Sequence, residues 1–179
     1  MKKETVISEE MFRVCSYIMQ GFTRQETLLL TGITSSRLAY LDRAKLIVPK
    51  KHGNSKKPYV MYAWVQLIQI RAIAHLKQQV SLAAMQKIVD FFDTCGFDED
   101  WQHNHLVVAG DEAFVSKPDW SSMPGIIQAA AKKNHAQLTV IVFPQIDRVV
   151  SDIWDVARNS GAIDMETFEA RSKLTYTVR

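Results

Sequence analysis

The stretch Leu30-Thr31-Gly32-Ile33-Thr34-Ser35-Ser36-Arg37-Leu38-Ala39-Tyr40-Leu41-Asp42-Arg43 decides the predicted fold. Gly32 tolerates a positive φ, so it suits a sharp turn between two helices. Thr34 is a good N-cap for a second helix, running roughly from Ser35 to Ala44. Before the turn, Thr23 with Glu26 three residues later has the pattern of a capping box, which predicts a helix over Arg24–Leu30.

A basic hairpin is predicted directly after this helix pair. Leu46-Ile47-Val48 reads as a short strand ended by Pro49, and Tyr59-Val60-Met61-Tyr62 alternates like a returning strand. Gly53-Asn54 between them supplies turn residues. Helix, turn, helix and hairpin in this order are the plan of a winged helix-turn-helix, in which one helix enters the DNA major groove.

The candidate DNA contacts lie on the second helix and on the hairpin. Arg37, Tyr40 and Arg43 are spaced by three residues and share a helix face. Arginine reaches phosphates or guanine edges, tyrosine reaches phosphates, and hairpin lysines suit phosphate contact. A solvated helix face is the alternative. The full predicted set is Arg24, Thr34, Ser35, Ser36, Arg37, Tyr40, Arg43, Lys50, Lys51, Lys56, Lys57 and Tyr59.

Helical periodicity flanks this region on both sides. A packing helix is expected over residues 5–20, and a long helix over Ala63–Gln79. Ser81 is then the expected N-cap of a further helix that reaches Phe92. The apolar stripes on the last two helices are expected to form core, with no cofactor site among them.

Residues 24–92 resemble the N-terminal domain of the MerR family of transcription regulators. The family's Gly-Val-Ser turn, its Thr-Leu-Arg-Tyr-Tyr-Glu helix and its Gly-Leu-Leu strand correspond to Gly32-Ile33-Thr34, Arg37–Asp42 and Lys45-Leu46-Ile47. The family's proline, basic wing and closing Tyr-Arg-x-Tyr correspond to Pro49, Lys50–Lys57 and Tyr59–Tyr62. The resemblance implies binding to double-stranded DNA. Departures are Ala39, Leu41, Val60 and Arg37, where the family has Arg, Tyr, Arg and Thr, so not every family contact carries over.

A small α+β domain is expected after Cys95, following a winged helix-turn-helix domain over residues 1–95. We expect a hairpin from His105–Ala109 and Glu112–Val115, a helix over Ile126–Asn134 and a central strand over Leu138–Phe143. Pro144 would open a helix that continues to Ser160, and Met165–Leu174 is a last helix or a tail. The fold class is thus mainly α with a small α+β C-terminal part.

This second part, residues 96–179, loosely resembles some bacterial antitoxins. They too join a MerR-like domain to a region that begins with a His-containing strand and a Gly-Asp or Asp-Gly turn. The resemblance implies a partner toxin as an alternative to dimerisation or small-ligand binding. The helix before Ser160 carries one amphipathic stripe, which would either form a homodimer interface or cover the sheet: Ile146, Val149, Val150, Ile153, Trp154 and Ala157.

Charge and composition narrow the function classes. Residues 1–95 contain 14 Lys and Arg against 7 Asp and Glu, a net charge of +7, whereas residues 96–179 contain 8 against 12, a net charge of −4. The first part is therefore the one suited to a polyanion. No apolar run is long enough for a membrane span, and Met1–Glu4 leads into a charged amphipathic stretch, so a cytoplasmic protein is expected.

Catalytic and metal sites are not predicted. Cys15 and Cys95 form no CxxC motif. His103 and His105 could share one side of a strand and bind a metal, but further ligands are not evident. The sequence contains no recognisable nucleophile motif, acid-base set or phosphate loop. We therefore expect neither an enzyme nor a cofactor. The favoured function is a sequence-specific, homodimeric transcription regulator, and the alternative is an antitoxin that binds DNA and a toxin.

Overall fold

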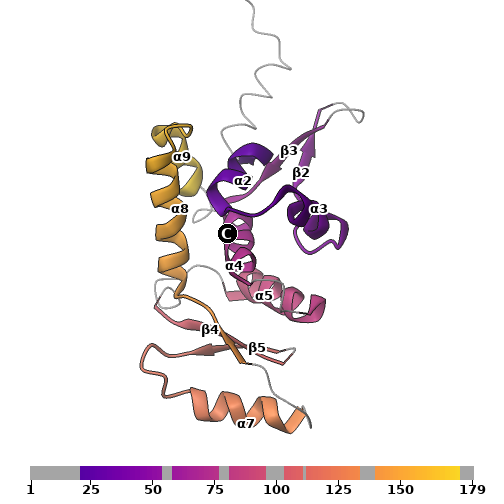
Figure 1. Cartoon of the computed structure of the whole chain (residues 1–179), viewed down its shortest axis with the longest axis vertical. Helices are drawn as coiled ribbons and strands as arrows, with labels where there is room; N and C mark the ends of the chain where they lie inside the picture. The colour runs from indigo at the N-terminus through magenta and orange to yellow at the C-terminus, as the bar shows by residue number, and fades with distance from the viewer. Residues whose placement is uncertain are drawn as a thin grey trace, which may run out of the picture.

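The computed structural model describes residues 21–53, 58–76, 81–95, 103–110, 112–133 and 140–173. The predicted helix over residues 5–20 and the wing lysines Lys56 and Lys57 lie outside this part of the chain. The described residues form helices and two small three-stranded antiparallel sheets, an α+β fold (Figure 1). Within them, no helix has the length and apolar character needed to cross a membrane.

The first sheet and four helices come from the first half of the chain. Strand β3 lies between β1 and β2 and pairs antiparallel with both. The elements in order are β1 (Phe22–Thr23), α2 (Arg24–Thr31), α3 (Ser35–Arg43), β2 (Lys50–His52), β3 (Tyr59–Tyr62), α4 (Trp64–His75) and α5 (Leu82–Cys95).

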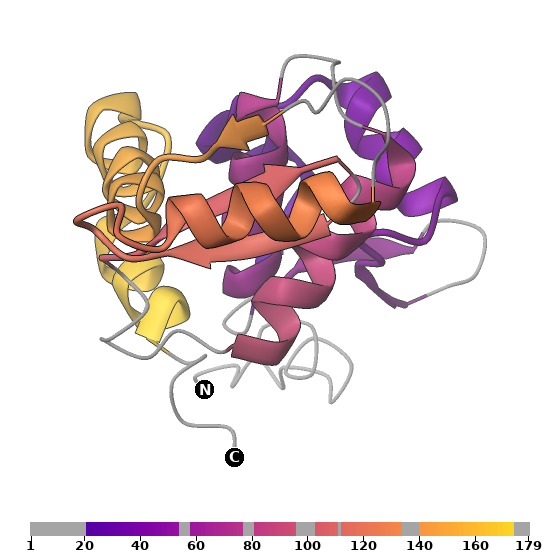
Figure 2. The same ribbon diagram turned by 90° about the horizontal axis from the view of Figure 1, so that it is seen from below.

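The second sheet lies between two layers of helix. The strands of this sheet are β4 (His105–Ala109), β5 (Glu112–Ser116) and β6 (Val140–Val142). The helices of the second half are α7 (Met123–Lys133), α8 (Ile146–Ser160) and α9 (Met165–Lys173). Helix α7 packs on one face, with Ile126 and Ala130 against Val107 and Ala109 of β4. Figure 2 shows α7 lying over this sheet, while α5 contacts β5 from the other side.

Two strand predictions were wrong. Leu46 and Ile47 are not a strand: their N–H groups donate to the Leu41 carbonyl at 3.0 and 3.3 Å, so they complete the turn after α3 and bury their side chains. The hairpin strand begins at Lys50 instead. Strand β6 is not central, because the sheet order is β5-β4-β6. An apolar, β-branched sequence could not distinguish an edge strand from a central one.

Several helix boundaries also differ from the predictions. Helix α8 begins at Ile146 with Gln145 as the N-cap, so Pro144 precedes the helix rather than opening it. Helix α7 starts at Met123, three residues before the predicted start. Of the two alternatives for the C-terminal end, a helix or a tail, the structure has the helix, α9.

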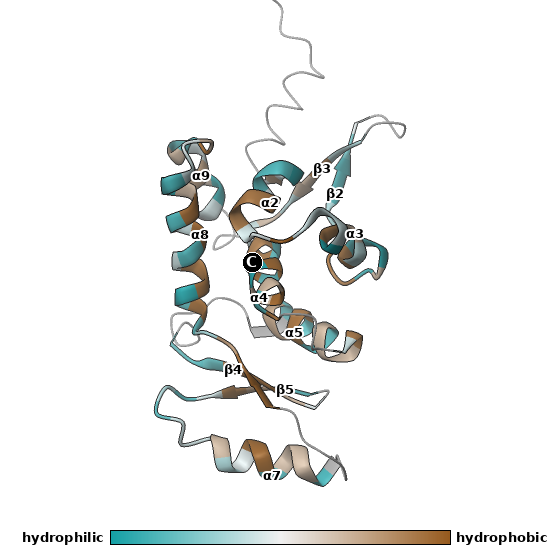
Figure 3. Ribbon diagram, viewed as in Figure 1, coloured by the Kyte–Doolittle hydropathy of each residue, from teal (hydrophilic) through white to brown (hydrophobic). Residues whose placement is uncertain are grey.

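One continuous hydrophobic core crosses residue 95. It joins side chains of α2, α4 and α5 to Leu106, Phe143 and the buried side of α8. Helix α8 lies beside α2 and α4 (Figure 1), with its polar side outward (Figure 3). The C-terminal helices therefore belong to the same core as the helix pair of the first half.

The predicted dimer stripe is buried within a single chain. Ile146, Val149 and Ile153 are at most 4% exposed, Val150 packs against the same core, and the Trp154 ring lies edge-on to Phe168 at 4.8 Å. The stripe faces α2 and α4 rather than mainly the sheet that contains β6. The chain's own helices cover much of this stripe, which favours a core role for it over a dimer interface.

Candidate nucleic-acid interface

The helix pair is held by the local interactions that its sequence predicts. Thr23 and Glu26 form a reciprocal capping box: the Glu26 N–H donates to Thr23 Oγ1 at 3.3 Å, and the Thr23 N–H donates to Glu26 Oε2 at 2.7 Å. Gly32 ends α2 in the left-handed conformation, with φ of 67°, and its N–H donates to the Leu28 carbonyl. The chain therefore reverses sharply before α3.

Helix α3 buries one side and exposes the other. Thr34 caps it, accepting a hydrogen bond of 3.3 Å from the Arg37 N–H. Leu38 and Leu41 are at most 1% exposed and fix the helix to the core. The residues that remain exposed around the helix are Thr34, Ser35, Ser36, Tyr40 and Arg43.

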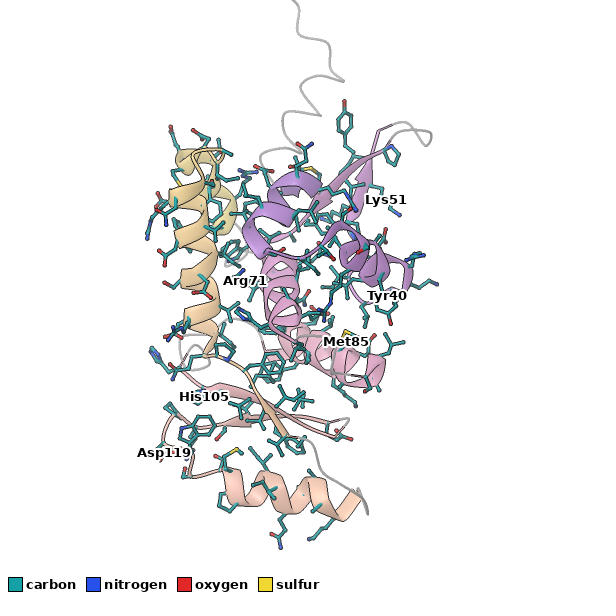
Figure 4. All side chains as sticks on the ribbon, in the orientation of Figure 1. Tyr40, Lys51, Arg71, Met85, His105 and Asp119 are labelled. Atoms are coloured by element: carbon teal, nitrogen blue, oxygen red, sulfur yellow. The ribbon has the colours of Figure 1, made fainter. Side chains whose placement is uncertain are left out.

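The basic hairpin lies next to the exposed side of α3. Lys50 and Lys51 of β2 are exposed, and Tyr59 of β3 is 62% exposed. Lys51 Nζ lies 3.5 Å from the Asp42 carboxylate on α3 and so links the two elements. Figure 4 shows Tyr40 and Lys51 on one side of the molecule, away from α8 and α9. The hairpin and α3 thus form one exposed surface, called here the α3–hairpin face: Ser35, Ser36, Tyr40, Arg43, Lys50, Lys51 and Tyr59.

Arg37, predicted to read bases, is engaged elsewhere. Its guanidinium donates to the carbonyls of Ile73 at 3.2 Å and Leu76 at 2.7 Å, at the C-terminal end of α4. A cation is favourable there because the last carbonyls of a helix carry partial negative charge. Both bonds are made by Nη2, so at least part of the Arg37 guanidinium is used to fix the start of α3 to the end of α4.

Arg24 holds the starts of the two helices together. Its Nη2 donates to Ser35 Oγ at 2.8 Å and to the Ser35 carbonyl at 3.2 Å. It also lies beside the buried Tyr62 phenol: burial raises the pKa of Tyr62, and the Arg24 charge opposes that rise. Arg24 therefore orients the N-terminal end of α3, in addition to any contact that it makes with DNA.

Lys45 is a further cation of this region, outside the set of contacts predicted from the sequence. It follows α3, is exposed, and adopts a φ of 56°, which is uncommon for a residue with a side chain. The sequence contains a signal for this conformation, because Lys45 stands at the glycine position of the Gly-Leu-Leu segment, and glycine is the residue that tolerates a positive φ. Its place beside Arg43 extends the positive charge at the end of α3.

His103 and His105 belong to no metal-binding cluster among the described residues. There, no group of three or more histidine, cysteine or acidic side chains is placed to hold an ion. His103 Nδ1 lies 3.6 Å from the Asp147 carboxylate, and the His105 ring stacks on Trp120 with centroids 4.0 Å apart. The two side chains thus contact different neighbours.

Comparison with known proteins adds no family assignment. No protein-family model matches this chain, and no curated protein matches its sequence.

Proposed function

We propose that the chain is a DNA-binding transcription regulator and that residues 22–95 contain a winged helix-turn-helix. The observation that carries this proposal is the α3–hairpin face: Tyr40 and Arg43 are exposed on α3, Lys50 and Lys51 are exposed on β2, and the Asp42–Lys51 ion pair links the two elements. Helix α3 is the element that would enter the major groove, which is wide enough to admit one helix. The hairpin would contact the backbone beside the groove.

The charges on this surface favour a polyanionic partner. Arg43, Lys45 and Lys50 are exposed cations. Asp42 is half-buried and is accompanied by Lys51. Phosphate contacts of this kind supply affinity without sequence information. Arginine and lysine supply specificity where they contact base edges. We propose that Arg43, near the C-terminal end of α3, contacts either a base edge or a phosphate.

The N-terminal end of α3 would meet the DNA backbone. Ser35 and Ser36 are exposed in the first turn of this helix, where free N–H groups and the helix dipole favour a phosphate. Thr34 already uses its hydroxyl oxygen as the cap, and Arg24 holds Ser35. We therefore propose that Arg24, Thr34 and Ser35 position the helix. The contacts to DNA away from this end of the helix would come from Tyr40, Arg43, Lys50, Lys51 and Tyr59.

A homodimer remains part of the proposal. Regulators that use this architecture bind paired half-sites, and the symmetry of the site mirrors that of the protein. The buried side of α8 is not available for this pairing. We therefore propose two chains on one DNA site, joined through a surface other than the α8 stripe.

An antitoxin is the second candidate, and one observation favours it. Strand β6 is at the edge of its sheet, pairs within the described residues only with β4, and exposes Val140 and Val142 by 36% and 45%. An apolar sheet edge is a template for pairing with another protein. Co-expression with the product of an adjacent gene, followed by co-purification of a defined complex that Val142→Lys disrupts, would support this candidate.

Selection of bound genomic DNA tests the proposed function. The purified chain is mixed with fragmented genomic DNA, and the retained fragments are sequenced. We expect a small set of enriched sites for the native chain and loss of that enrichment for Arg43→Ala combined with Lys50→Ala and Lys51→Ala. A matched control removes three exposed cations elsewhere: Lys117→Ala, Lys132→Ala and Arg148→Ala. Equal enrichment by both variants would contradict the proposal.

A further inference from the structure

Arg71 connects three helices at the turn that precedes α3. It belongs to α4, and its Nη1 donates to the carbonyl of Thr31, the last residue of α2, at 3.1 Å. Its Nη2 lies 3.4 Å from the Asp152 carboxylate on α8. Figure 4 shows Arg71 between α8 and the helix pair. One guanidinium therefore joins α8, by way of α4, to the end of α2.

The contact is close enough to restrict the turn itself. A Cβ atom on Gly32 would lie 3.2 Å from Arg71 Nη1, so the guanidinium is packed directly against the turn. Arg71 is only 20% exposed at its side chain, and its Nε is buried without a hydrogen-bond partner among the described residues. The hydrogen bonds of Nη1 to Thr31 and of Nη2 to Asp152 are thus the interactions that orient this group.

The other side of the turn is fixed to the same helix. Arg37, in the first turn of α3, donates to the Ile73 and Leu76 carbonyls of α4. Helix α4 therefore holds the end of α2 through Arg71 and the start of α3 through Arg37. Of these two contacts, only that of Arg71 also includes an acidic group from α8, Asp152.

We propose that Arg71, oriented by Asp152, is a positioning residue that sets the direction of α3 for reading DNA sequence. The proposal rests on the proposed function, because α3 is there the helix that enters the groove. A recognition helix must be held within narrow limits for base contacts, whereas phosphate contacts tolerate a change in angle better. Loss of the Asp152 carboxylate would thus reduce discrimination between DNA sequences more than it reduces general affinity.

Helix α8 offers a matched control for this contact. Asp155 lies three residues further along the same helix and pairs with Arg158 at 3.5 Å, with both side chains about 60% exposed. Asp155→Asn removes the same charge from the same helix without touching Arg71. Asp152→Glu keeps the carboxylate and serves as the rescue variant.

The test compares two 30-bp duplexes, one carrying a site enriched by genomic selection and one a scrambled version. Fluorescence anisotropy gives both affinities at a temperature where circular dichroism shows each variant folded. We expect Asp152→Asn to lower the ratio of the two affinities by at least about fivefold, the lower end of typical coupling between sites. Its affinity for the scrambled duplex should stay near the native value, as should both affinities of Asp155→Asn and Asp152→Glu.

The outcomes separate failure of the positioning role from failure of the proposed function. A folded Asp152→Asn with the native ratio would overturn the positioning role while leaving the proposed function intact. A native chain that binds neither duplex would overturn the proposed function, and the positioning role with it. Should Asp152→Asn fail to fold, Arg71→Lys replaces it: a single ammonium cannot reproduce the guanidinium fork. In Arg71→Lys, a similar fall in the ratio of the affinities for the enriched and scrambled duplexes would support the proposal. A native ratio would overturn it.

Discussion

Arg171 donates a 2.9 Å hydrogen bond to the Glu26 carboxylate and thereby joins α9 to the first turn of α2. The guanidinium also donates to the Gly21 carbonyl at 3.1 Å and lies 4.5 Å from the centre of the Phe22 ring. The Arg171 side chain is 5% exposed. The last described helix is therefore bound to the segment from which the proposed DNA-binding unit begins.

Removal of Arg171 should be costly for folding. Arg171→Ala leaves the Glu26 carboxylate, which is 22% exposed, without its cation and removes the stacking on Phe22. We expect a loss of about 3 kcal/mol in the free energy of unfolding, the lower end for breaking a buried pair. Urea denaturation measures it. Arg158→Ala removes an exposed pair and should cost less than about 1 kcal/mol. Equal losses would contradict the assigned role of Arg171.

Gly32 and Gly161 should differ in their tolerance of alanine. Both are left-handed, with φ of 67° and 60°, and a side chain in that conformation costs about 1–2 kcal/mol. At Gly161 an added Cβ meets nothing within 4 Å, but at Gly32 it meets Arg71 Nη1 at 3.2 Å. We therefore expect Gly32→Ala to lower the thermal midpoint further than Gly161→Ala. The opposite order would mean that Arg71 does not crowd the turn.

His75 should make stability fall as the solution becomes acidic. Burial lowers the pKa of His75 below its ordinary value of 6.5, the Arg71 charge lowers it further, and Asp152, 3.7 Å away, opposes both. The unfolded chain therefore binds this proton more readily than the folded one. The contribution of neutral His75 to the free energy of unfolding is fully present above pH 6.5. That contribution is lost as the pH falls from 6.5 through the lower pKa of the folded chain.

Urea denaturation at pH 7 and pH 5 measures this effect. We expect a smaller difference between the two pH values for His75→Gln than for the native chain. The carboxyls of Asp119 and Asp164 do not interfere, because hydrogen bonds from Ser121 and Thr167 lower their pKa values below 3.8. An unchanged pH difference in His75→Gln would show that His75 does not carry the dependence.

Local signals predicted the helix pair well. The capping box of Thr23 and Glu26, the positive φ of Gly32 and the Thr34 cap all depend on residues within four positions of one another, so sequence alone was sufficient. The hairpin strand at Tyr59–Tyr62 and the hairpin of β4 and β5 were likewise readable from alternation and turn residues.

Long-range packing was not predictable from these patterns. The stripe on α8 showed that a buried side exists, but not that α2 and α4 cover it. Arg37 had the spacing of a DNA contact, yet its guanidinium is held by carbonyls 36 and 39 positions away. Arg71 and Arg171 gave no signal at all, because their partners Asp152 and Glu26 are 81 and 145 positions distant.

The salt dependence of DNA affinity tests the central claim most directly. Binding of the native chain to a 30-bp duplex is measured across a range of salt concentrations. We expect Arg43→Ala combined with Lys50→Ala and Lys51→Ala to flatten the plot of log affinity against log salt by about 0.9 for each phosphate that these side chains no longer neutralise. The control that lacks Lys117, Lys132 and Arg148 should keep the native slope. A native slope for the first variant would contradict the assignment of the α3–hairpin face to DNA.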